Sequence, residues 1–311
     1  MRVTTVGIIG FGKIAHDQHV PSIAGSPAFR LAAITSQRGL RIEGVPTFRT
    51  PEEMVAAVPD LDAVAVCTPP QARYATARAM LAAGKHVMLE KPPAATLSEL
   101  HELARFADEQ GRVLFTTWHS QYNAAVAEAK AVLAGETIRI LSVTWKEDVR
   151  RWHPGQTWIW APGGFGVFDP GINALSIISA IMPGPIFVRS AELVFPSNCD
   201  APIAARLEFG SGAGDADLTA DFDWRHTGLQ TWEILVETAG GRNVKLENGG
   251  ARLLVDGALV VEEIPTEYEQ IYARFAELLA AGTSHVDPAP LRLVADAFLI
   301  GRRRETEPFI E

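Results

Sequence analysis

Short apolar runs alternate with helix-like segments through the first third of the chain. The runs cover residues 4–9, 31–35, 61–67, 85–89 and 113–117, and segments of helical spacing separate them, among them 71–83 and 98–110. Strands that are apolar on both faces are typical of a parallel sheet covered by helices on either side. The pattern therefore predicts a doubly wound α/β domain over residues 1–119, with Ser98 as the N-terminal cap of its last helix.

The pattern changes from about residue 120. One helix-like segment, 123–133, precedes strand-like runs at residues 138–145, 188–194, 203–209, 218–222, 232–237, 243–247 and 252–255. Glycine pairs and Asp-Gly between the last runs indicate hairpins. Consecutive strands after a βα series predict an α+β domain over residues 120–311, with an open, largely antiparallel sheet and helices on one side. We expect the other face of that sheet to pair two copies of the chain as a homodimer.

Composition and charge narrow the classes of function. There are 28 Lys and Arg residues against 37 Asp and Glu, a net charge of −9, whereas a nucleic-acid-binding domain presents a basic face. Apolar runs stay far below the ~20 residues of a membrane span, and the first residues lead into a strand instead of a signal peptide. Two cysteines exclude a disulfide framework and a cysteine-rich zinc site. We expect a cytoplasmic protein with a small-molecule substrate and no nucleic-acid, membrane or metal partner.

A glycine motif lies where the first strand meets the first helix. Gly10 permits a tight turn, Gly12 lets the backbone approach a pyrophosphate, and the small Ala15 lets the helix pack closely on the strand. The start of the helix adds free N–H groups and partial positive charge. The motif predicts a Rossmann domain that binds a dinucleotide, with Lys13 and Ile14 of the same loop also in contact with it.

The end of the second strand indicates which dinucleotide. A carboxylate about 20 residues after the glycines holds the ribose hydroxyls of NAD, but this chain has Ser36, Gln37 and Arg38 there. A hydroxyl can donate to a 2′-phosphate, and a guanidinium can pair with it through two N–H groups. We therefore expect NADP to be preferred, with NAD as the alternative cofactor.

Further motifs follow in a fixed order. Thr-Pro-Pro at residues 68–70 comes after the run at 61–67, and Glu-Lys-Pro at residues 90–92 comes after the run at 85–89. Together with the glycine-rich segment 163–173, they resemble the Gfo/Idh/MocA oxidoreductases over nearly the whole chain. The resemblance implies a Rossmann domain followed by an α+β domain. It also implies cofactor contacts from Thr68, Pro69, Glu90 and Lys91.

Two segments of the second half carry a more specific resemblance. Residues 146–160 and 168–176 are similar to bacterial enzymes of this family that oxidise C1 of L-arabinose or D-galactose to the aldonolactone with NAD(P). Asn173 and Tyr74 stand where many family members carry His. The asparagine matches the sugar 1-dehydrogenases, but it removes a titratable group from the candidate acids and bases.

Two residues are candidates for the chemistry itself. Lys91 directly follows a strand, and strand ends of a doubly wound sheet point into the ligand crevice. Its charge there would stabilise a developing alkoxide. Asp169 lies four residues before Asn173, so on a helix the two share a face, and Asp169 is the candidate base. An ordinary Asp has a pKa of about 3.9; burial would raise it and a nearby Lys91 would lower it. The alternative for Asp169 is a helix cap.

Sugar recognition needs polar groups beside an apolar wall, because each buried hydroxyl must find a partner. All seven tryptophans lie at or after residue 118, which places the substrate side in the later part of the chain. By resemblance, the sugar contacts are His119, Glu147, Trp152, His153, Asn173 and Trp232. Three of these have plainer interpretations: Glu147 pairs with Arg150, His153 belongs to a loop, and Trp232 lies in the sheet core.

Two other functions stay open on the same fold. One is a regulator that senses cofactor or sugar without turnover, although such a protein would need neither Lys91 nor Asp169. The other is a dehydrogenase of a different sugar or of a cyclic polyol.

Overall fold

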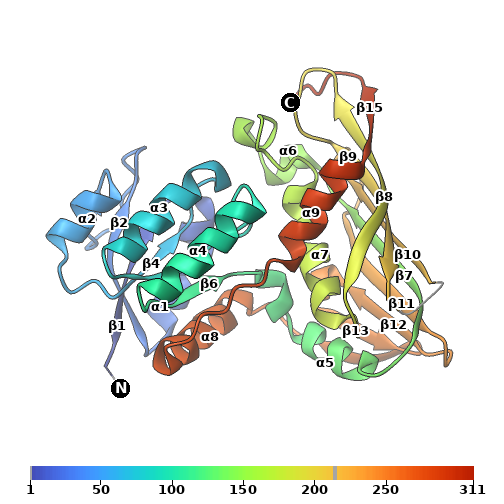
Figure 1. Cartoon of the computed structure of the whole chain (residues 1–311), viewed down its shortest axis with the longest axis horizontal. Coiled ribbons are helices and arrows are strands. Elements are labelled where there is room, and N and C mark those ends of the chain that lie inside the picture. Colours follow the sequence, from blue (N-terminus) through green and yellow to red (C-terminus); the bar gives the residue numbers. More distant parts are fainter. Residues whose placement is uncertain (1, 213–215) are drawn as a thin grey trace. The chain divides into compact units, whose positions relative to one another are not determined.

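The computed structural model describes residues 2–212 and 216–311, and its backbone divides into two compact units (Figure 1). Unit 1 comprises residues 1–119 and 267–288, and unit 2 comprises residues 120–266 and 289–311. The sequence pattern suggested a single boundary after residue 119. The structure instead returns the chain to unit 1 for one long helix, α8 (Glu267–Ala281).

Unit 1 contains a six-stranded parallel sheet in the order β3-β2-β1-β4-β5-β6, which confirms the predicted doubly wound domain. Its strands are β1 (Thr4–Ile9), β2 (Phe29–Thr35), β3 (Thr47–Phe48), β4 (Ala63–Val66), β5 (His86–Leu89) and β6 (Leu114–Thr116). Its helices before residue 119 are η1 (Ala15–His19), α1 (Val20–Gly25), α2 (Pro51–Ala57), α3 (Pro70–Ala82) and α4 (Leu97–Glu109).

Helices cover both faces of this sheet. On one face, Met54, Met80 and Leu103 of α2, α3 and α4 pack against apolar strand residues in one buried cluster. On the other face, α8 places Tyr272 and Phe275 against Phe29 of β2, with ring centroids 5.3 and 5.9 Å apart. The second half of the chain therefore supplies a layer that the first 119 residues lack.

The start of α4 differs from the expectation. Thr96, and not Ser98, caps the helix: its hydroxyl accepts from the amide of Glu99, whose carboxylate accepts from the Thr96 amide. This reciprocal pair satisfies two amides that a helix start leaves without partners. Ser98 lies inside the first turn, so the prediction of a Ser98 cap was wrong by two residues.

Unit 2 contains a nine-stranded sheet in the order β14-β13-β12-β11-β7-β10-β9-β8-β15. Among the described residues, β7–β10 and β8–β15 are the parallel pairs and the other pairs are antiparallel, which confirms the largely antiparallel prediction. The strands are β7 (Ile138–Lys146), β8 (Ile186–Pro196), β9 (Ala204–Ser211), β10 (Asp217–Asp223), β11 (Thr231–Thr238), β12 (Asn243–Glu247), β13 (Arg252–Val255), β14 (Ala258–Glu262) and β15 (Arg302–Thr306).

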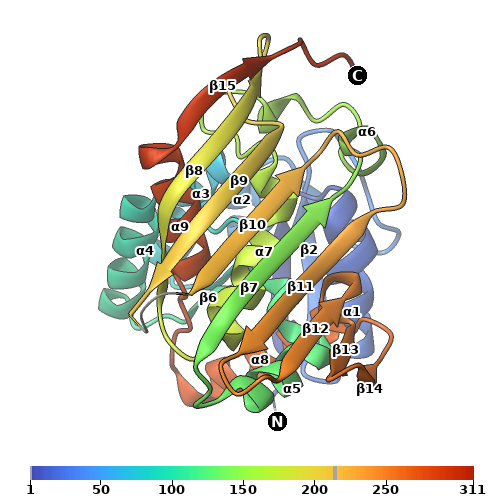
Figure 2. The same ribbon diagram turned by 90° about the vertical axis from the view of Figure 1, so that its right-hand side faces the viewer.

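One face of this sheet is covered and the other is open, as Figure 2 shows. The covering helices are α5 (Ala124–Leu133), α7 (Phe168–Ile181) and α9 (Ala289–Ile300). Along the chain, two short helical segments separate β7 from α7: α6 (Val149–Trp152) and η3 (Thr157–Ile159). Charged pairs lie along the strands, including Lys146–Asp221 at 2.5 Å and Lys245–Glu233 at 3.1 Å. The open face is therefore polar.

Three consecutive arginines, residues 302–304, form the start of strand β15 directly after α9. Gly301 ends α9, and the arginines then pair in parallel with β8. Arg304 meets Glu192 at 2.9 Å, and the Arg303 guanidinium lies 4.8 Å from the centre of the Phe195 ring. The sequence pattern does not predict this strand, because three consecutive arginines lack the alternation of apolar and polar residues that is typical of a strand.

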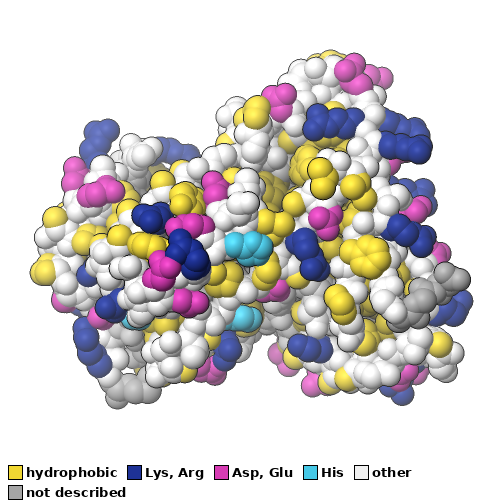
Figure 3. Space-filling view, viewed as in Figure 1, with side chains coloured by type: hydrophobic (Ala, Val, Ile, Leu, Met, Phe, Trp, Pro, Cys, Tyr) yellow, Lys and Arg dark blue, Asp and Glu magenta, His cyan; other side chains and the backbone are white. Residues whose placement is uncertain are grey.

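Basic side chains lie among acidic ones on the face shown in Figure 3. Over residues 2–212 and 216–311, no helix is long and apolar enough to cross a membrane.

Candidate active site

The glycine loop after β1 has the geometry that a dinucleotide needs. Gly10 has a φ of +85°, and a Cβ there would lie 2.9 Å from the backbone nitrogen of Thr68. Only glycine satisfies both conditions. At Gly12, by contrast, a Cβ would have no neighbour nearer than the Gly10 carbonyl at 4.0 Å. The backbone is thus open above Gly12, so a pyrophosphate fits there.

A cavity of about 330 Å³ lies beside this loop. Its lining residues come from the glycine loop, η1 and the turn after β2: Phe11, Gly12, Lys13, His16, Asp17, Leu40 and Arg41. Ile14 is exposed at the same loop. Sequence reasoning missed Arg41, although it follows Arg38 by one short turn and carries the same cationic signal.

The three predicted cofactor-selecting residues have different surroundings. Ser36 is buried, and its hydroxyl accepts from the amide of Leu40 at 3.1 Å. Gln37 and Arg38 are exposed. The Ser36 hydroxyl therefore fixes the turn that carries Arg38 and Arg41, and it keeps one proton to donate.

Strands β1, β4, β5 and β6 are neighbours and parallel, so the residues that follow them meet at one edge of the sheet. Gly10, Thr68, Lys91 and His119 follow these four strands in turn. The structure thus brings four of the predicted residues of unit 1 to a common edge, and Pro69 is exposed there.

Arg73 of α3 fixes two of these turns and was missed by sequence reasoning. Its buried guanidinium donates to the carbonyls of Thr68, Glu90 and Pro92. One side chain therefore joins the Thr-Pro-Pro turn to the Glu-Lys-Pro turn. An arginine in a helix has no sequence signal for this role, since its carbonyl partners lie up to 19 residues away.

Glu90 lies in a buried group of four polar side chains, and not at an exposed cofactor surface. Its Oε1 accepts from Tyr268 at 2.8 Å and is 2.9 Å from Nε2 of His19, whose Nδ1 is 2.9 Å from the Tyr272 hydroxyl. Its Oε2 accepts from the amide of Lys91 at 3.1 Å. We refer to Glu90, His19, Tyr268 and Tyr272 as the buried quartet, which holds the backbone at Lys91.

The electrostatics of the quartet favour an ion pair. Burial alone would raise the pKa of Glu90, but the hydrogen bond and charge of His19, with His119 and Tyr268, lower it to about 2. Burial likewise opposes protonation of His19, yet its pKa is raised well above 6.5 by the neighbouring Cys67, Tyr272 and Glu90. The two shifts have opposite directions, and both favour a carboxylate at Glu90 beside a protonated imidazole at His19.

His119 is also held within unit 1. Its Nδ1 is 3.0 Å from Oε2 of Glu267, and its ring stacks on Tyr268 with centroids 5.7 Å apart. Burial opposes its protonation, but Glu267 and Glu90 raise its pKa above 6.5, while the charge of Lys91 lowers it. His119 and Lys91 thus lie near enough for their charges to interact.

In unit 2, Asp169 and Asn173 lie one turn apart on α7, as their spacing predicted. Asp169 is buried and Asn173 half-buried. Oδ2 of Asp169 is 3.5 Å from Nε2 of His153, which belongs to the loop after α6. The structure therefore places a carboxylate, an imidazole and an amide from the predicted set on one side of α7.

Glu147 binds two tryptophans, and this overturns the suggestion that it pairs with Arg150. Its Oε1 accepts from the indole of Trp224 at 3.0 Å, and its Oε2 from that of Trp232 at 2.7 Å. The Arg150 guanidinium is 3.7 Å from Asp148 instead. The carboxylate is 3% exposed, so the two indoles fix it where it follows β7.

Aromatic rings connect these groups into one wall. Trp152 packs on Trp232 with centroids 5.6 Å apart, and His153 packs on Trp224 at 5.1 Å. Trp152 is 38% exposed, whereas Trp224 is fully buried. Trp118 of unit 1 is 2% exposed and its indole donates to the carbonyl of Asp287, so it offers no open ring face.

The chain is similar to known oxidoreductases. Residues 4–118 match the model of the Gfo/Idh/MocA oxidoreductase family, NAD-binding Rossmann fold. Over all 311 residues the chain is 45% identical to a galactose 1-dehydrogenase from Pseudomonas fluorescens, with 100% of both chains covered. The chain belongs to the Gfo/Idh/MocA family. It is therefore an oxidoreductase, as predicted, and its cofactor is NAD or NADP.

Solved structures agree with this family assignment. A D-galactose-1-dehydrogenase from Rhizobium etli is 53% identical, with a TM-score of 0.94 over 100% of this chain and 99% of that one. A 3-ketoreductase from Actinomadura kijaniata shares the fold at 18% identity, with a TM-score of 0.86 over 98% of this chain and 100% of that one. The two-unit architecture is thus that of the family.

Proposed function

We propose that this chain is an NAD(P)-dependent sugar 1-dehydrogenase that oxidises C1 of D-galactose or L-arabinose to the aldonolactone. The observation that carries the proposal is similarity over the full length to two galactose 1-dehydrogenases, 45% and 53% identical. The similarity covers unit 2 as well as unit 1. The buried carboxylates of unit 2 supply the polar groups that such a substrate needs.

The reaction removes a hydride from C1 and a proton from the C1 hydroxyl, so that C1 becomes the carbonyl of a lactone. When bound, the nicotinamide accepts the hydride. Lys91 stabilises the negative charge that develops on the hydroxyl oxygen. Asp169 accepts the proton, and His153 beside it, at 3.5 Å, offers a partner for the carboxylate before and after the transfer.

Recognition of the ring is assigned to both polar and aromatic residues. The amide of Asn173 offers a donor and an acceptor to vicinal hydroxyls, and His119, His153 and Glu147 offer further partners. Trp152 and Trp232 offer flat apolar faces to the C–H groups of the sugar. L-Arabinose and D-galactose share their ring configuration apart from the C5 substituent, so residues that read the ring hydroxyls accept both.

NADP is the preferred cofactor in this proposal. Arg38 is exposed on the turn that Ser36 fixes, and Arg41 lines the cavity beside the glycine loop. Two guanidinium groups on one turn favour a 2′-phosphate. The turn has no carboxylate at residues 36–38 to hold the ribose hydroxyls of NAD or to repel that phosphate.

The open, polar face of the nine-stranded sheet is our proposed dimer interface. Its paired charges and half-buried strand residues are suited to a partner with the same pattern. Sedimentation equilibrium at micromolar concentration should give twice the mass of the chain. A monomer mass would overturn this part of the proposal.

The absorbance band of the reduced cofactor tests the activity. The purified chain should generate this band with D-galactose and L-arabinose, faster with NADP than with NAD, and the product should hydrolyse to the aldonic acid. A cyclic polyol and a ketose serve as negative controls. Cofactor binding without reduction by any sugar would overturn the proposal and favour a sensor that lacks turnover.

A further inference from the structure

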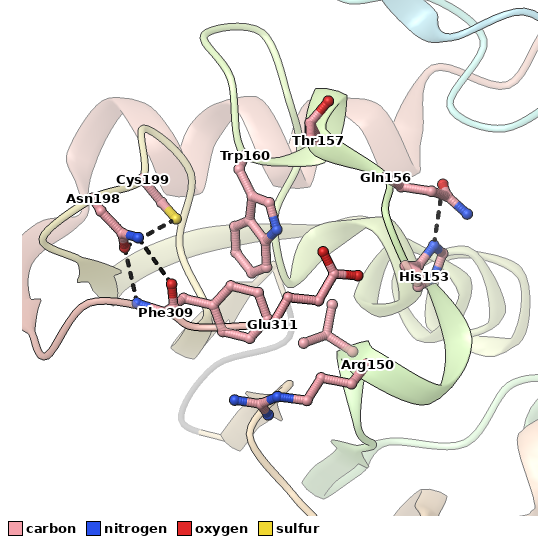
Figure 4. A pocket seen from close by; sticks show the side chains of 10 residues that line it. Arg150, His153, Gln156, Thr157, Trp160, Asn198, Cys199, Phe309 and Glu311 are labelled. Atoms are coloured by element: carbon pink, nitrogen blue, oxygen red, sulfur yellow. Dashed lines mark hydrogen bonds between the residues drawn. The ribbon is translucent and has the colours of Figure 1, made fainter.

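A second cavity, of about 270 Å³, lies in unit 2 behind the loop at residues 149–160 (Figure 4). Arg150, His153, Gln156, Thr157 and Trp160 of the loop line one side. Four residues of other segments close it: Asn198, Cys199, Phe309 and Glu311. The loop that carries His153 thus rests on residues at the end of the chain.

Hydrogen bonds hold this end in place. The amide side chain of Asn198 donates to the carbonyl of Phe309 at 2.8 Å and accepts from its backbone N–H at 2.8 Å. Arg150 of the loop donates to the carbonyl of Ile310 through Nε at 3.2 Å and through Nη2 at 2.8 Å. The amide of Gly155 donates to the Glu311 carboxylate. Both ends of the loop's first half are therefore tied to residues 309–311.

Ring packing adds a second set of contacts. The Phe309 ring lies 4.9 Å from that of Trp160 and 4.8 Å from the guanidinium carbon of Arg150. Trp160 in turn packs edge-on against Trp224, the fully buried indole that binds Glu147, at 5.4 Å. Phe309 is thus in contact with a row of side chains that ends at the proposed substrate wall.

His153 lies on the same loop and faces two ways. Its Nδ1 is 3.5 Å from Oε1 of Gln156 beside the cavity, and its Nε2 is 3.5 Å from Asp169. His153 ends the single turn of α6, where its amide donates to the carbonyl of Val149 at 2.8 Å. A contact as long as 3.5 Å therefore depends on where this short segment lies. The position of the imidazole against the proposed base is therefore set by what supports the loop.

We propose that Phe309 and Asn198 are positioning residues, which support loop 149–160 and so hold His153 against Asp169. Neither is assigned a contact with sugar or cofactor. The effect on catalysis rests on the proposed function, whereas the support of the loop does not. An error of about 1 Å in the position of a catalytic group can cost on the order of 100-fold in rate.

The test compares Phe309→Ala and Asn198→Ala with Phe309→Tyr, which keeps the ring, and with Ile264→Ala as the control. Ile264 is 86% exposed in the same unit. For each variant, hydrogen exchange over residues 149–160 is measured without substrate, and kcat and KM for D-galactose are measured with NADP. Binding of NADP is followed by its own fluorescence.

Both alanine variants should speed exchange in residues 149–160 by at least tenfold. They should also lower kcat about 10- to 100-fold, with a smaller change in KM and the same Kd for NADP. Phe309→Tyr and Ile264→Ala should resemble the parent chain. Unchanged exchange, or faster exchange with unchanged kcat, would overturn the proposal. If the parent oxidises no sugar, the proposed function fails, and the exchange measurement alone decides whether residues 309–311 support the loop.

Discussion

The two proposed catalytic groups are held in contrasting ways. Lys91 follows a strand of unit 1, and its backbone rests on the buried quartet and on Arg73. Asp169 of unit 2 starts a helix, and its imidazole neighbour belongs to a loop supported from the end of the chain. The parallel sheet and the buried quartet fix Lys91, whereas a loop and packed aromatic rings fix the surroundings of Asp169.

This difference corresponds to what each unit must accommodate. Residues 4–118 match the NAD-binding Rossmann fold of the family, so a rigid arrangement around Lys91 suits the part of the chain that binds the shared type of cofactor. Sugar substrates vary, and loops tolerate sequence change better than strands do. Residues 147–160 can therefore be remodelled for another substrate while the edge of the parallel sheet stays as it is.

The largest effect should come from the proposed base. Asp169→Asn keeps the size of the side chain but cannot accept a proton, so kcat should fall about 10²- to 10⁴-fold. Steady-state rates with D-galactose and NADP measure this, and Asp217→Asn on the exposed start of β10 is the matched control. A kcat within twofold of the parent would remove Asp169 from the mechanism.

Next in size is the loss of an ion from the quartet. Glu90→Gln leaves His19 buried beside a neutral amide, and breaking a buried pair costs about 3–5 kcal/mol. Thermal unfolding should show a large drop in Tm. Glu109→Gln, which breaks an exposed pair with Arg105 on α4, should change the free energy of unfolding by less than about 0.5 kcal/mol. Equal effects would mean that the quartet is not what makes unit 1 rigid.

The same quartet predicts how stability depends on pH. The pKa of Glu90 is lowered to about 2 from an ordinary value of 4.5, so its contribution is complete above pH 4.5 and is lost as the pH falls toward 2. The pKa of His19 is raised above 6.5, so its contribution is complete below pH 6.5 and is lost at higher pH. Tm measured from pH 3 to 9 should fall on both sides, and Glu90→Gln should flatten the acid side.

Substitutions of the two tryptophans that bind Glu147 should have smaller effects, and they distinguish a packing role from a role in sugar recognition. Trp232→Phe and Trp224→Phe each remove one N–H donor from Glu147. Trp224 is fully buried and Trp232 half-buried. We expect Trp224→Phe to lower mainly Tm, with a loss of about 1–3 kcal/mol. Trp232→Phe should instead raise KM for D-galactose about tenfold. The reverse order would assign recognition to Trp224.

The smallest effect should be confined to the cofactor. Arg38→Ala removes a charge-assisted partner of a 2′-phosphate, worth about 1.5 kcal/mol or more, so Kd for NADP should rise about tenfold and Kd for NAD should not change. Arg49→Ala, an exposed arginine of the same unit, is the control. If NADP affinity is unchanged in Arg38→Ala, the assignment passes to Arg41.

Local patterns account for the parts of the molecule that sequence predicted well. The strands of unit 1, the glycine loop and the strand-end position of Lys91 depend on residues close together in the chain. Asp169 and Asn173 share a helix face for the same reason. Each of these features needs only a period or a turn preference to be recognised.

The features that the sequence did not predict depend on residues far apart in the chain. Glu147 meets tryptophans 77 and 85 residues away, and Glu90 meets a tyrosine 178 residues away. Charge and spacing near Glu147 offered Arg150 as an alternative partner, but the carboxylate binds the two indoles instead. The proposed role of residues 309–311 had no sequence signal either, since it rests on backbone hydrogen bonds and one aromatic ring.

Helix α8 has a consequence for synthesis of the chain. Domains that are continuous in sequence can fold as soon as they leave the ribosome, first domain first. Here one face of the parallel sheet lacks the rings of Tyr272 and Phe275 until residue 281 has been made. The quartet beneath Lys91 lacks both tyrosines until then. Unit 1 begins the chain but is completed only after nearly all of unit 2 has been translated.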